Sequence, residues 1–164
     1  MELQIVFVSS GGMYRAFTWW TLENGINPTD SAEVVSLLAK TEFSCGQEDQ
    51  VGFVEVQGRR LTEQEMKSDA VNLSVSPIAA IPEVRARLVA EQRAFADQSS
   101  LVMEGRDIGT VVFPDTLHKF FIDASPEIRA ARRSAEGIQD SISERDRADS
   151  MRAASPLKAA DDAM

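Results

Sequence analysis

One candidate for a functional site is the glycine-bounded pentapeptide Gly105-Arg106-Asp107-Ile108-Gly109, which directly follows the apolar run Leu101-Val102-Met103. Two glycines let the backbone bend tightly, so the segment can present one fixed cation, Arg106, and one fixed carboxylate, Asp107, at the end of a strand. The structural alternative is that Arg106 and Asp107 belong to a local ion-pair network. The motif by itself is compatible with both interpretations.

A second candidate is Ser10-Gly11-Gly12-Met13-Tyr14-Arg15, which follows another predicted strand and opens a predicted helix. Unpaired N–H groups at the N-terminus of a helix favour an anion. The Ser10 hydroxyl, the helix N-terminus and Arg15, one turn into the helix, can therefore converge on a phosphate. Ser-Gly-Gly also makes ordinary strand-to-helix turns, so this motif alone leaves both interpretations open.

Arginine-rich segments near the C-terminus form the third candidate. Arg145, Asp149 and Arg152 are spaced by four and three residues, which places them on one face of a helix. The two arginines can grip a phosphate, and the aspartate can bind a ribose hydroxyl. A similar set is formed by Arg129, Arg132 and Arg133. Intrahelical salt bridges are the alternative for both sets.

Three predicted strands would position these side chains. Residues 2–8 predict the first strand, 101–103 the second and 120–123 the third, with helical segments between them. Strands that alternate with helices indicate a parallel sheet covered by helices on both faces. Ligands bind beyond the carboxyl ends of the strands in such sheets, which predicts a site made by residues 9–15 and 104–109.

Capping residues and apolar spacing mark the helices. The expected caps are Gly25 after a helix over 13–24, Asp30 with Glu33, and Thr62 with Glu65. The helical stretch after Thr62 is expected to break near Pro77 and to restart at Pro82, a good first-turn residue. Residues 136–152 are almost wholly polar and predict a mobile helical hairpin. Residues 42–61 alternate in short runs, which predicts a small antiparallel insertion.

The composition excludes several classes of protein. A chain of 164 residues suits one globular domain, and 17 basic against 26 acidic residues, a net charge of −9, argue against general nucleic-acid binding. One histidine and one cysteine leave too few ligands for a zinc site. No apolar run reaches the ~20 residues of a membrane span, and a signal peptide is not apparent. Ten of the 13 arginines fall between Arg85 and Arg152, which favours a small anionic ligand.

Four segments taken together resemble the bacterial cytidylate kinases, in order and spacing, from about residue 7 to 163. They are Ser10–Arg15, Ile81–Arg85, Gly105–Pro114 and Glu144–Ser150. The resemblance implies a P-loop kinase-like α/β core, with a parallel sheet flanked by helices, and phosphoryl transfer from ATP, with Mg²⁺, to CMP or dCMP in pyrimidine nucleotide metabolism. It also implies a cytoplasmic monomer. It divides the domain into a core (1–25 and 82–128), a monophosphate-binding insertion (26–81) and a lid (129–152).

The resemblance also implies roles for single residues on the acceptor side. Arg15 and Arg106 would hold the CMP phosphate, with Ser10 beside them. The residues that would read cytosine are Ser76, Arg85 and Asp107. A carboxylate suits that task because the exocyclic amine of cytosine is a hydrogen-bond donor.

Further roles concern the ribose and the transferred group. Arg145 and Asp149 would contact the ribose, and Arg152 would bridge toward the transferring phosphoryl group. The lid residues that would contact ATP are Arg129, Arg132 and Arg133. The expected catalytic residues are Arg106, Arg133 and Arg152, and no side chain is expected to bind a metal.

One departure from the family pattern concerns the phosphate donor. These kinases cradle ATP and Mg²⁺ with Gly-x-x-x-x-Gly-Lys-Ser/Thr, but none of the nine glycines here is followed by lysine. Ser9 stands where the family has aspartate. The first strand, phosphate loop, first helix and C-terminal end of the family are therefore expected to be missing. Either an empty slot would separate strands 101–103 and 119–123, or residues 2–8 would move into the central position.

Two hypotheses of function follow. The first is a (d)CMP kinase that lacks its donor loop and is inactive as this chain. The second is a non-catalytic CMP-binding or protein-interaction module derived from such a kinase.

Overall fold

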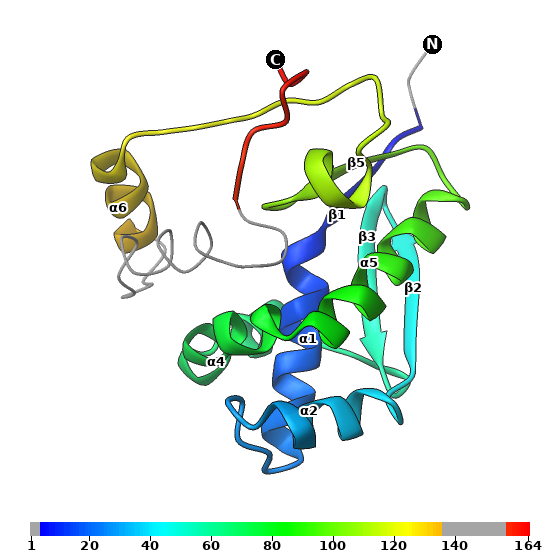
Figure 1. Cartoon of the computed structure of the whole chain (residues 1–164), viewed down its shortest axis with the longest axis vertical. Helices are drawn as coiled ribbons and strands as arrows, with labels where there is room; N and C mark the ends of the chain where they lie inside the picture. The colour runs from blue at the N-terminus through cyan, green and yellow to red at the C-terminus, as the bar shows by residue number, and fades with distance from the viewer. Residues whose placement is uncertain (1–3, 136–156) are drawn as a thin grey trace. The chain divides into compact units, whose positions relative to one another are not determined.

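Three parallel strands belong to a mixed five-stranded sheet. The computed structural model describes residues 4–135 and 157–164. The strands are β1 (Val6–Ser9), β2 (Phe43–Glu48), β3 (Val51–Val56), β4 (Arg59–Arg60) and β5 (Leu101–Glu104). They follow the order β2-β3-β1-β5, with β4 paired to β3, and β1 is parallel to both β3 and β5 (Figure 1). The predicted α/β class with a mainly parallel core is confirmed.

The helices belong to two compact units, Met1–Gly105 and Arg106–Met164. The first unit contains α1 (Ser10–Glu23), α2 (Ser31–Leu38), α3 (Glu63–Met66), α4 (Asp69–Ala80) and α5 (Pro82–Ala96). The second contains a π-helical turn, η1 (Ile108–Val112), and α6 (Pro126–Ala135). No helix of the described residues is long and apolar enough to cross a membrane. The expected hairpin over 136–152 lies outside the described residues.

Local capping signals were predicted well. The Asp30 side chain accepts a hydrogen bond from the Glu33 N–H, and Thr62 and Glu65 form a reciprocal capping box. Gly25 has a φ of 67°, the left-handed conformation that ends a helix and that glycine adopts without steric cost. These contacts span only three residues each, so the sequence determines them directly.

The expected break near Pro77 is wrong, because α4 runs through this proline. Proline removes one helical hydrogen bond, which belonged to the carbonyl of Leu73. Leu73 is 76% exposed, so water can reach this side of the helix. The helix ends instead at Ala80, and the next residue, Ile81, has an extended ψ of 121° because a proline follows it.

The antiparallel hairpin joins the main sheet. Phe7 of β1 pairs with Val51, and its N–H donates to the Gln50 carbonyl at 2.8 Å. The turn between β2 and β3 consists of Asp49 and Gln50, whose φ values of 50° and 63° suit a tight two-residue hairpin. The expected insertion over 26–81 therefore shares its sheet with the core strand β1.

The expected strand at 120–123 is not formed. Phe121 donates its N–H to the Met164 carbonyl at 2.9 Å, and the Met164 N–H donates to Lys119 at 3.0 Å. Phe120 and Ile122 are 69% and 92% exposed. The expected empty slot is therefore not formed either, because β1 lies in an interior position between β3 and β5, as the second alternative required.

Helix α5 covers one face of the sheet. Val6 and Val8 of β1 pack with Phe95 in a small buried cluster. Gly52 is required there, since a Cβ at this position would lie 2.9 Å from Val8. On the opposite face Phe7, Val51 and Val102 stand in register and are about half exposed. The expectation of a sheet covered on both faces is therefore not met along this row.

A larger cluster surrounds α1 and contains most of the buried apolar residues. Phe17 of α1, Val34 of α2, Ile78 of α4 and Leu88 of α5 are all fully buried in it. Helix α1 thus runs through the centre of the first unit (Figure 1). The packing fixes the orientation of α1, and with it the position of Arg15.

Gln92 is the one polar residue in the row of α5 that runs from Leu88 to Phe95. It is 1% exposed, and its Oε1 accepts no hydrogen bond from the residues that the structure describes. We expect Gln92→Met to raise the free energy of unfolding by about 1–2 kcal/mol, because it removes an unsatisfied buried oxygen and keeps the side-chain volume. Urea denaturation measures the change. Gln92→Glu, which buries a charge, should lower the midpoint, and a lower midpoint for the methionine variant would contradict the argument.

Candidate functional site

The junction of β1 and α1 forms the centre of the candidate site. Helix α1 begins at Ser10, directly after β1 ends, and earlier than the expected start at Met13. The Ser9 hydroxyl donates to the Glu104 carboxylate at 2.6 Å, which ties the carboxyl ends of β1 and β5 together. The Ser10 side chain is buried. A strand end, a carboxylate and a helix N-terminus thus meet at this edge of the sheet.

Open space lies over the first turn of α1. Among the described residues, a Cβ built on Gly12 would contact nothing within 4 Å, and one on Gly11 would meet only the Ser9 hydroxyl at 3.8 Å. The two glycines are therefore not demanded by packing of the protein against itself. The first turn of a helix has N–H groups without partners inside the helix, which can bind an anion.

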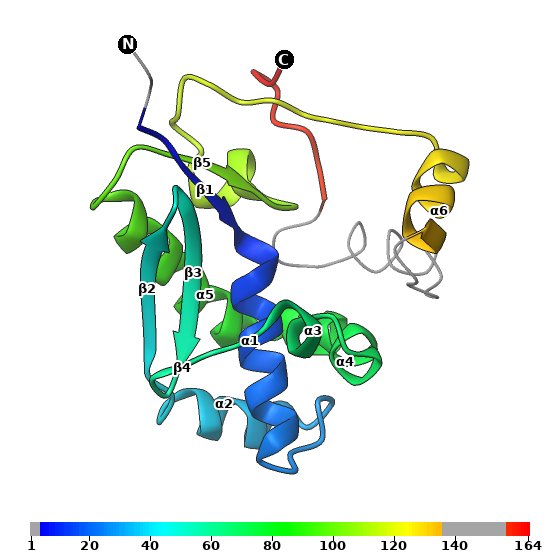
Figure 2. The same ribbon diagram turned by 180° about the vertical axis from the view of Figure 1, so that it is seen from behind.

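Arg15 is half-buried and held by two acceptors, one at the end of α3 and one on α4. Its Nη1 donates to the Asn72 side-chain oxygen at 2.6 Å and to the Met66 carbonyl at 3.0 Å. Figure 2 shows α3 and α4 beside α1, the arrangement that makes these contacts. The sequence predicted Arg15 but gave no signal for Asn72, which lies 57 residues away.

Arg85 is a buried arginine on α5. Its Nη1 donates to the Ala79 carbonyl at 3.0 Å, and its guanidinium carbon lies 5.6 Å from the centre of the Tyr14 ring. Ser76 is half-buried on α4, one helical turn before the end of that helix. The first unit therefore brings Arg85 close to the residue that precedes Arg15.

Arg106 and Asp107 belong to the second unit. Asp107 is buried, Arg106 is half-buried, and both have interaction partners. The Asp107 carbonyl accepts the N–H groups of Val111 and Val112 at 2.9 and 3.2 Å. The predicted loop over 105–109 therefore runs into η1 from Ile108 onward.

Gly109 packs closely against a lysine side chain. A Cβ at this position would lie 3.3 Å from the Lys119 side chain. Lys119 is itself buried, and its ammonium donates to the Pro114 carbonyl at 2.5 Å and to Asp162 at 2.6 Å. This lysine helps to fix the chain that follows η1.

The expected lid residues are only partly described. Arg129 on α6 donates from Nε to the Ala124 carbonyl at 3.0 Å, and Arg132 is exposed. Arg133 also belongs to α6. The residues Arg145, Asp149 and Arg152 lie outside the described part of the chain.

The described residues do not favour a metal site or a nucleophilic cysteine. Among them, no group of three or more His, Cys, Asp or Glu could hold a metal ion. Burial first, and the Glu91 carboxylate second, raise the pKa of the Cys45 thiol to about 11. A thiol with so high a pKa is a poor nucleophile at neutral pH.

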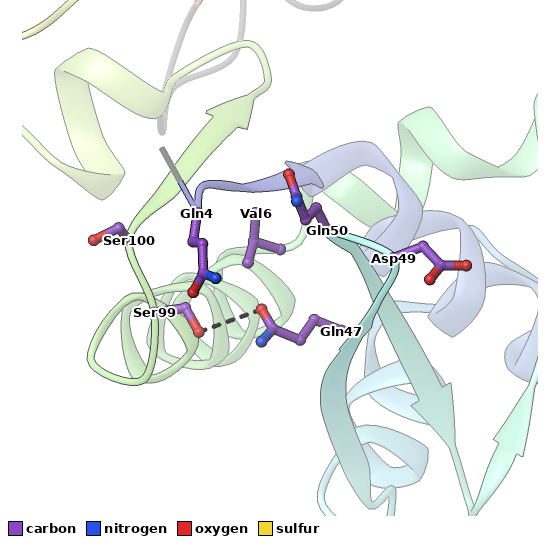
Figure 3. Close-up of a pocket in the computed structure, with 7 residues that line it drawn as sticks. All are labelled: Gln4, Val6, Gln47, Asp49, Gln50, Ser99 and Ser100. Carbon is purple, nitrogen blue, oxygen red and sulfur yellow. Dashed lines mark hydrogen bonds between the residues drawn. The ribbon is translucent and has the colours of Figure 1, made fainter. Parts of the chain in front are cut away.

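A cavity of about 440 Å³ lies at the other end of the strands. Its lining residues are Gln4, Val6, Gln47, Asp49, Gln50, Ser99 and Ser100. Figure 3 shows the side chains of Gln4, Gln47 and Ser99 pointing toward one another, with Ser99 donating to Gln47 at 3.4 Å. Val6 is the first residue of β1, whereas the candidate site lies at Ser9, its last. The cavity is therefore not part of the candidate site.

Comparisons with known proteins agree with the motifs. The family model described as cytidylate kinase matches residues 1–164. The chain is 39% identical to the cytidylate kinase of Streptomyces avermitilis over 172 residues, covering 99% of this chain and 74% of that protein. It is 42% identical to the cytidylate kinase of Pelotomaculum thermopropionicum over 175 residues, covering 99% and 76%. A bifunctional pantoate ligase/cytidylate kinase of Synechococcus sp. (strain WH7803) is 41% identical over 175 residues, covering 99% of this chain and 36% of that protein.

Proposed function

The chain belongs to the cytidylate kinase family, and we propose that it binds CMP or dCMP as the acceptor of a phosphoryl group from ATP. The observation that carries this proposal is the placement of Arg15. It lies one turn into a helix that starts at the carboxyl end of β1, and it is held there by two hydrogen bonds. A guanidinium fixed in this way forms a planar fork for phosphate with little further loss of side-chain freedom.

Arg15 and Arg106 hold the acceptor phosphate in this proposal, and Ser10 lies beside it. Their positive charge offsets the repulsion between the acceptor phosphate and the incoming phosphoryl group. Such transfer is catalysed by positioning and charge neutralisation, without a covalent protein intermediate. The cytosine is read by Ser76, Arg85 and Asp107.

The remaining roles are proposals for residues of the lid and the ribose contact. Arg145 and Asp149 contact the ribose, and Arg152 acts between the two phosphates. The side chains that approach the donor phosphates are Arg129, Arg132 and Arg133. Residues 26–81 form the monophosphate-binding region of a cytoplasmic monomer.

The residues of this chain fit a binding site for ATP and Mg²⁺ less well than they fit a site for the acceptor nucleotide. ATP and Mg²⁺ are usually held by backbone amides, a lysine and a hydroxyl of a glycine-rich loop. No glycine of this sequence is followed by lysine, and the described residues contain no cluster that could hold a metal. These residues therefore supply the acceptor half of the reaction. The same observation favours a second candidate function, CMP binding without phosphoryl transfer.

Base selection tests the proposed acceptor site. We expect the full chain to bind CMP about ten- to a hundredfold more tightly than UMP, because UMP presents an acceptor where Asp107 needs a donor, a mismatch of roughly 1–3 kcal/mol. Titration calorimetry with the two nucleotides measures the preference. Asp107→Ala should abolish it.

Asp107→Asn provides a matched control. Its amide can donate to the O4 atom of uracil, so the preference should shift toward UMP while the side-chain shape is kept. Equal affinities for CMP and UMP in the parent chain, or an unchanged preference in Asp107→Ala, would contradict the assignment.

A further inference from the structure

Asn72 connects α4 to the guanidinium of Arg15. The side-chain oxygen of Asn72 accepts from Arg15 Nη1 at 2.6 Å, in a half-buried setting. We propose that Asn72 is a positioning residue, which fixes the Arg15 fork for the phosphate of the acceptor nucleotide. The inference rests on the proposed function, because it takes Arg15 as a phosphate ligand.

The orientation of the Asn72 amide follows from its second hydrogen bond. Its Nδ2 donates to the Lys67 carbonyl at 2.7 Å. A carbonyl can only accept, so the nitrogen must face Lys67 and the oxygen must face Arg15. The amide thus links the end of α3 to α1 in one defined orientation.

The segment that supplies both acceptors is itself well fixed. The Thr62–Glu65 capping box caps the N-terminus of α3. After α3, the Ser68 hydroxyl donates to the Glu65 carbonyl at 3.0 Å. The Asn72 N–H donates to the Ser68 carbonyl at 2.9 Å. Met66 and Asn72 therefore present their oxygens to Arg15 from a short segment held by its own hydrogen bonds.

These contacts engage one nitrogen of the Arg15 guanidinium. The Met66 carbonyl and the Asn72 amide take the two hydrogens of Nη1. Both of these acceptors are neutral groups.

A double-mutant cycle on the full chain tests the inference. Binding of CMP and of cytidine is measured by calorimetry for the parent, Arg15→Ala, Asn72→Ala and the double variant. We expect Asn72→Ala to weaken CMP binding by about three- to tenfold, to leave cytidine binding unchanged, and to have no further effect once Arg15 is alanine. Equal losses for CMP and cytidine, or the same loss in both backgrounds, would overturn the inference.

Two further variants separate positioning from stability. Asn72→Asp keeps the acceptor and the side-chain shape, but it loses the hydrogen bond to the Lys67 carbonyl and adds a charge that competes with the phosphate. The melting temperature should therefore fall, and CMP binding should weaken more than cytidine binding. An unchanged ratio of CMP to cytidine affinity in Asn72→Asp would overturn the inference even if Asn72→Ala does not fold. Asn24→Ala is the matched control, since Asn24 also donates to a helix carbonyl, that of Trp20 at 2.8 Å, and it should leave both affinities unchanged.

The same experiment distinguishes failure of the inference from failure of the proposed function. If Arg15→Ala leaves the preference for CMP over cytidine unchanged, Arg15 is not a phosphate ligand and the proposed acceptor site is wrong. If Arg15→Ala removes the preference and Asn72→Ala does not reduce it, only the positioning role is wrong.

Discussion

Replacing Arg106 with alanine is expected to weaken CMP binding by about ten- to a hundredfold, because a charge-assisted hydrogen bond to phosphate contributes roughly 1.5–3 kcal/mol. Cytidine lacks the phosphate, so its binding should be almost unchanged. Arg106→Lys keeps the charge but loses the planar fork, and it should restore only part of the affinity. Calorimetry with CMP and cytidine on both variants measures these differences.

The structural alternative makes a different prediction for the same variants. If Arg106 serves only an ion pair with its neighbour Asp107, Arg106→Ala should lower the melting temperature and weaken CMP and cytidine alike. Equal losses for the two ligands would remove Arg106 from the phosphate site. The half-buried position of Arg106 beside a buried Asp107 makes both measurements necessary.

The parts of the fold that depend on short sequence separations could be predicted. The caps at Asp30, Thr62 and Gly25 each involve residues within a few positions, and the structure contains all three. The apolar spacing of Val84, Leu88 and Phe95 likewise places all three in the core. Local geometry decides these features, so the residue types are sufficient evidence.

Two local rules failed where tertiary contacts decided the outcome. Pro77 predicted a helix break, but Val75, Ile78 and Ala79 are buried on both sides of it, and their packing holds α4 together. The run Phe120 to Asp123 has the composition of a strand, yet Phe121 pairs with Met164 and not with the sheet. An apolar run does not specify its partner.

In the candidate site too, contacts between residues far apart in the sequence could not be predicted. Arg15, Arg85, Arg106 and Asp107 could be chosen from motifs, since their types and positions resemble a known family. The contact that orients Arg15 could not be predicted, because Asn72 lies 57 residues away. The same holds for the hydrogen bond between Ser9 and Glu104, which lie 95 residues apart. Those pairs exist only after α4 packs on α1 and β5 pairs with β1.

Phosphoryl transfer requires residues that hold ATP as well as residues that hold the acceptor. We expect the 164-residue chain to bind CMP but to show no appreciable CMP-dependent release of ADP from ATP. Its sequence contains no glycine followed by lysine, so the amides, lysine and hydroxyl of the usual donor cradle are not among its residues. Removing even one group that stabilises the developing charge lowers the rate about a hundred- to a thousandfold. Here all the groups of the usual glycine-rich donor loop are missing from the sequence, so the expected loss of rate is larger.

A coupled assay of ADP release, run beside calorimetry on the same preparation, decides the matter. Measurable CMP binding without turnover is the expected result, and the binding shows that the chain is folded and its acceptor site intact. The cytidylate kinase of Streptomyces avermitilis, 39% identical over 172 residues, serves as the active control in the same buffer. Robust CMP-dependent turnover by the pure chain would refute the prediction, since ATP would then have to be held by residues other than a glycine-rich loop. Arg129 and Arg132 of α6 would be the first residues to replace with alanine in that event, because guanidinium groups bind phosphate.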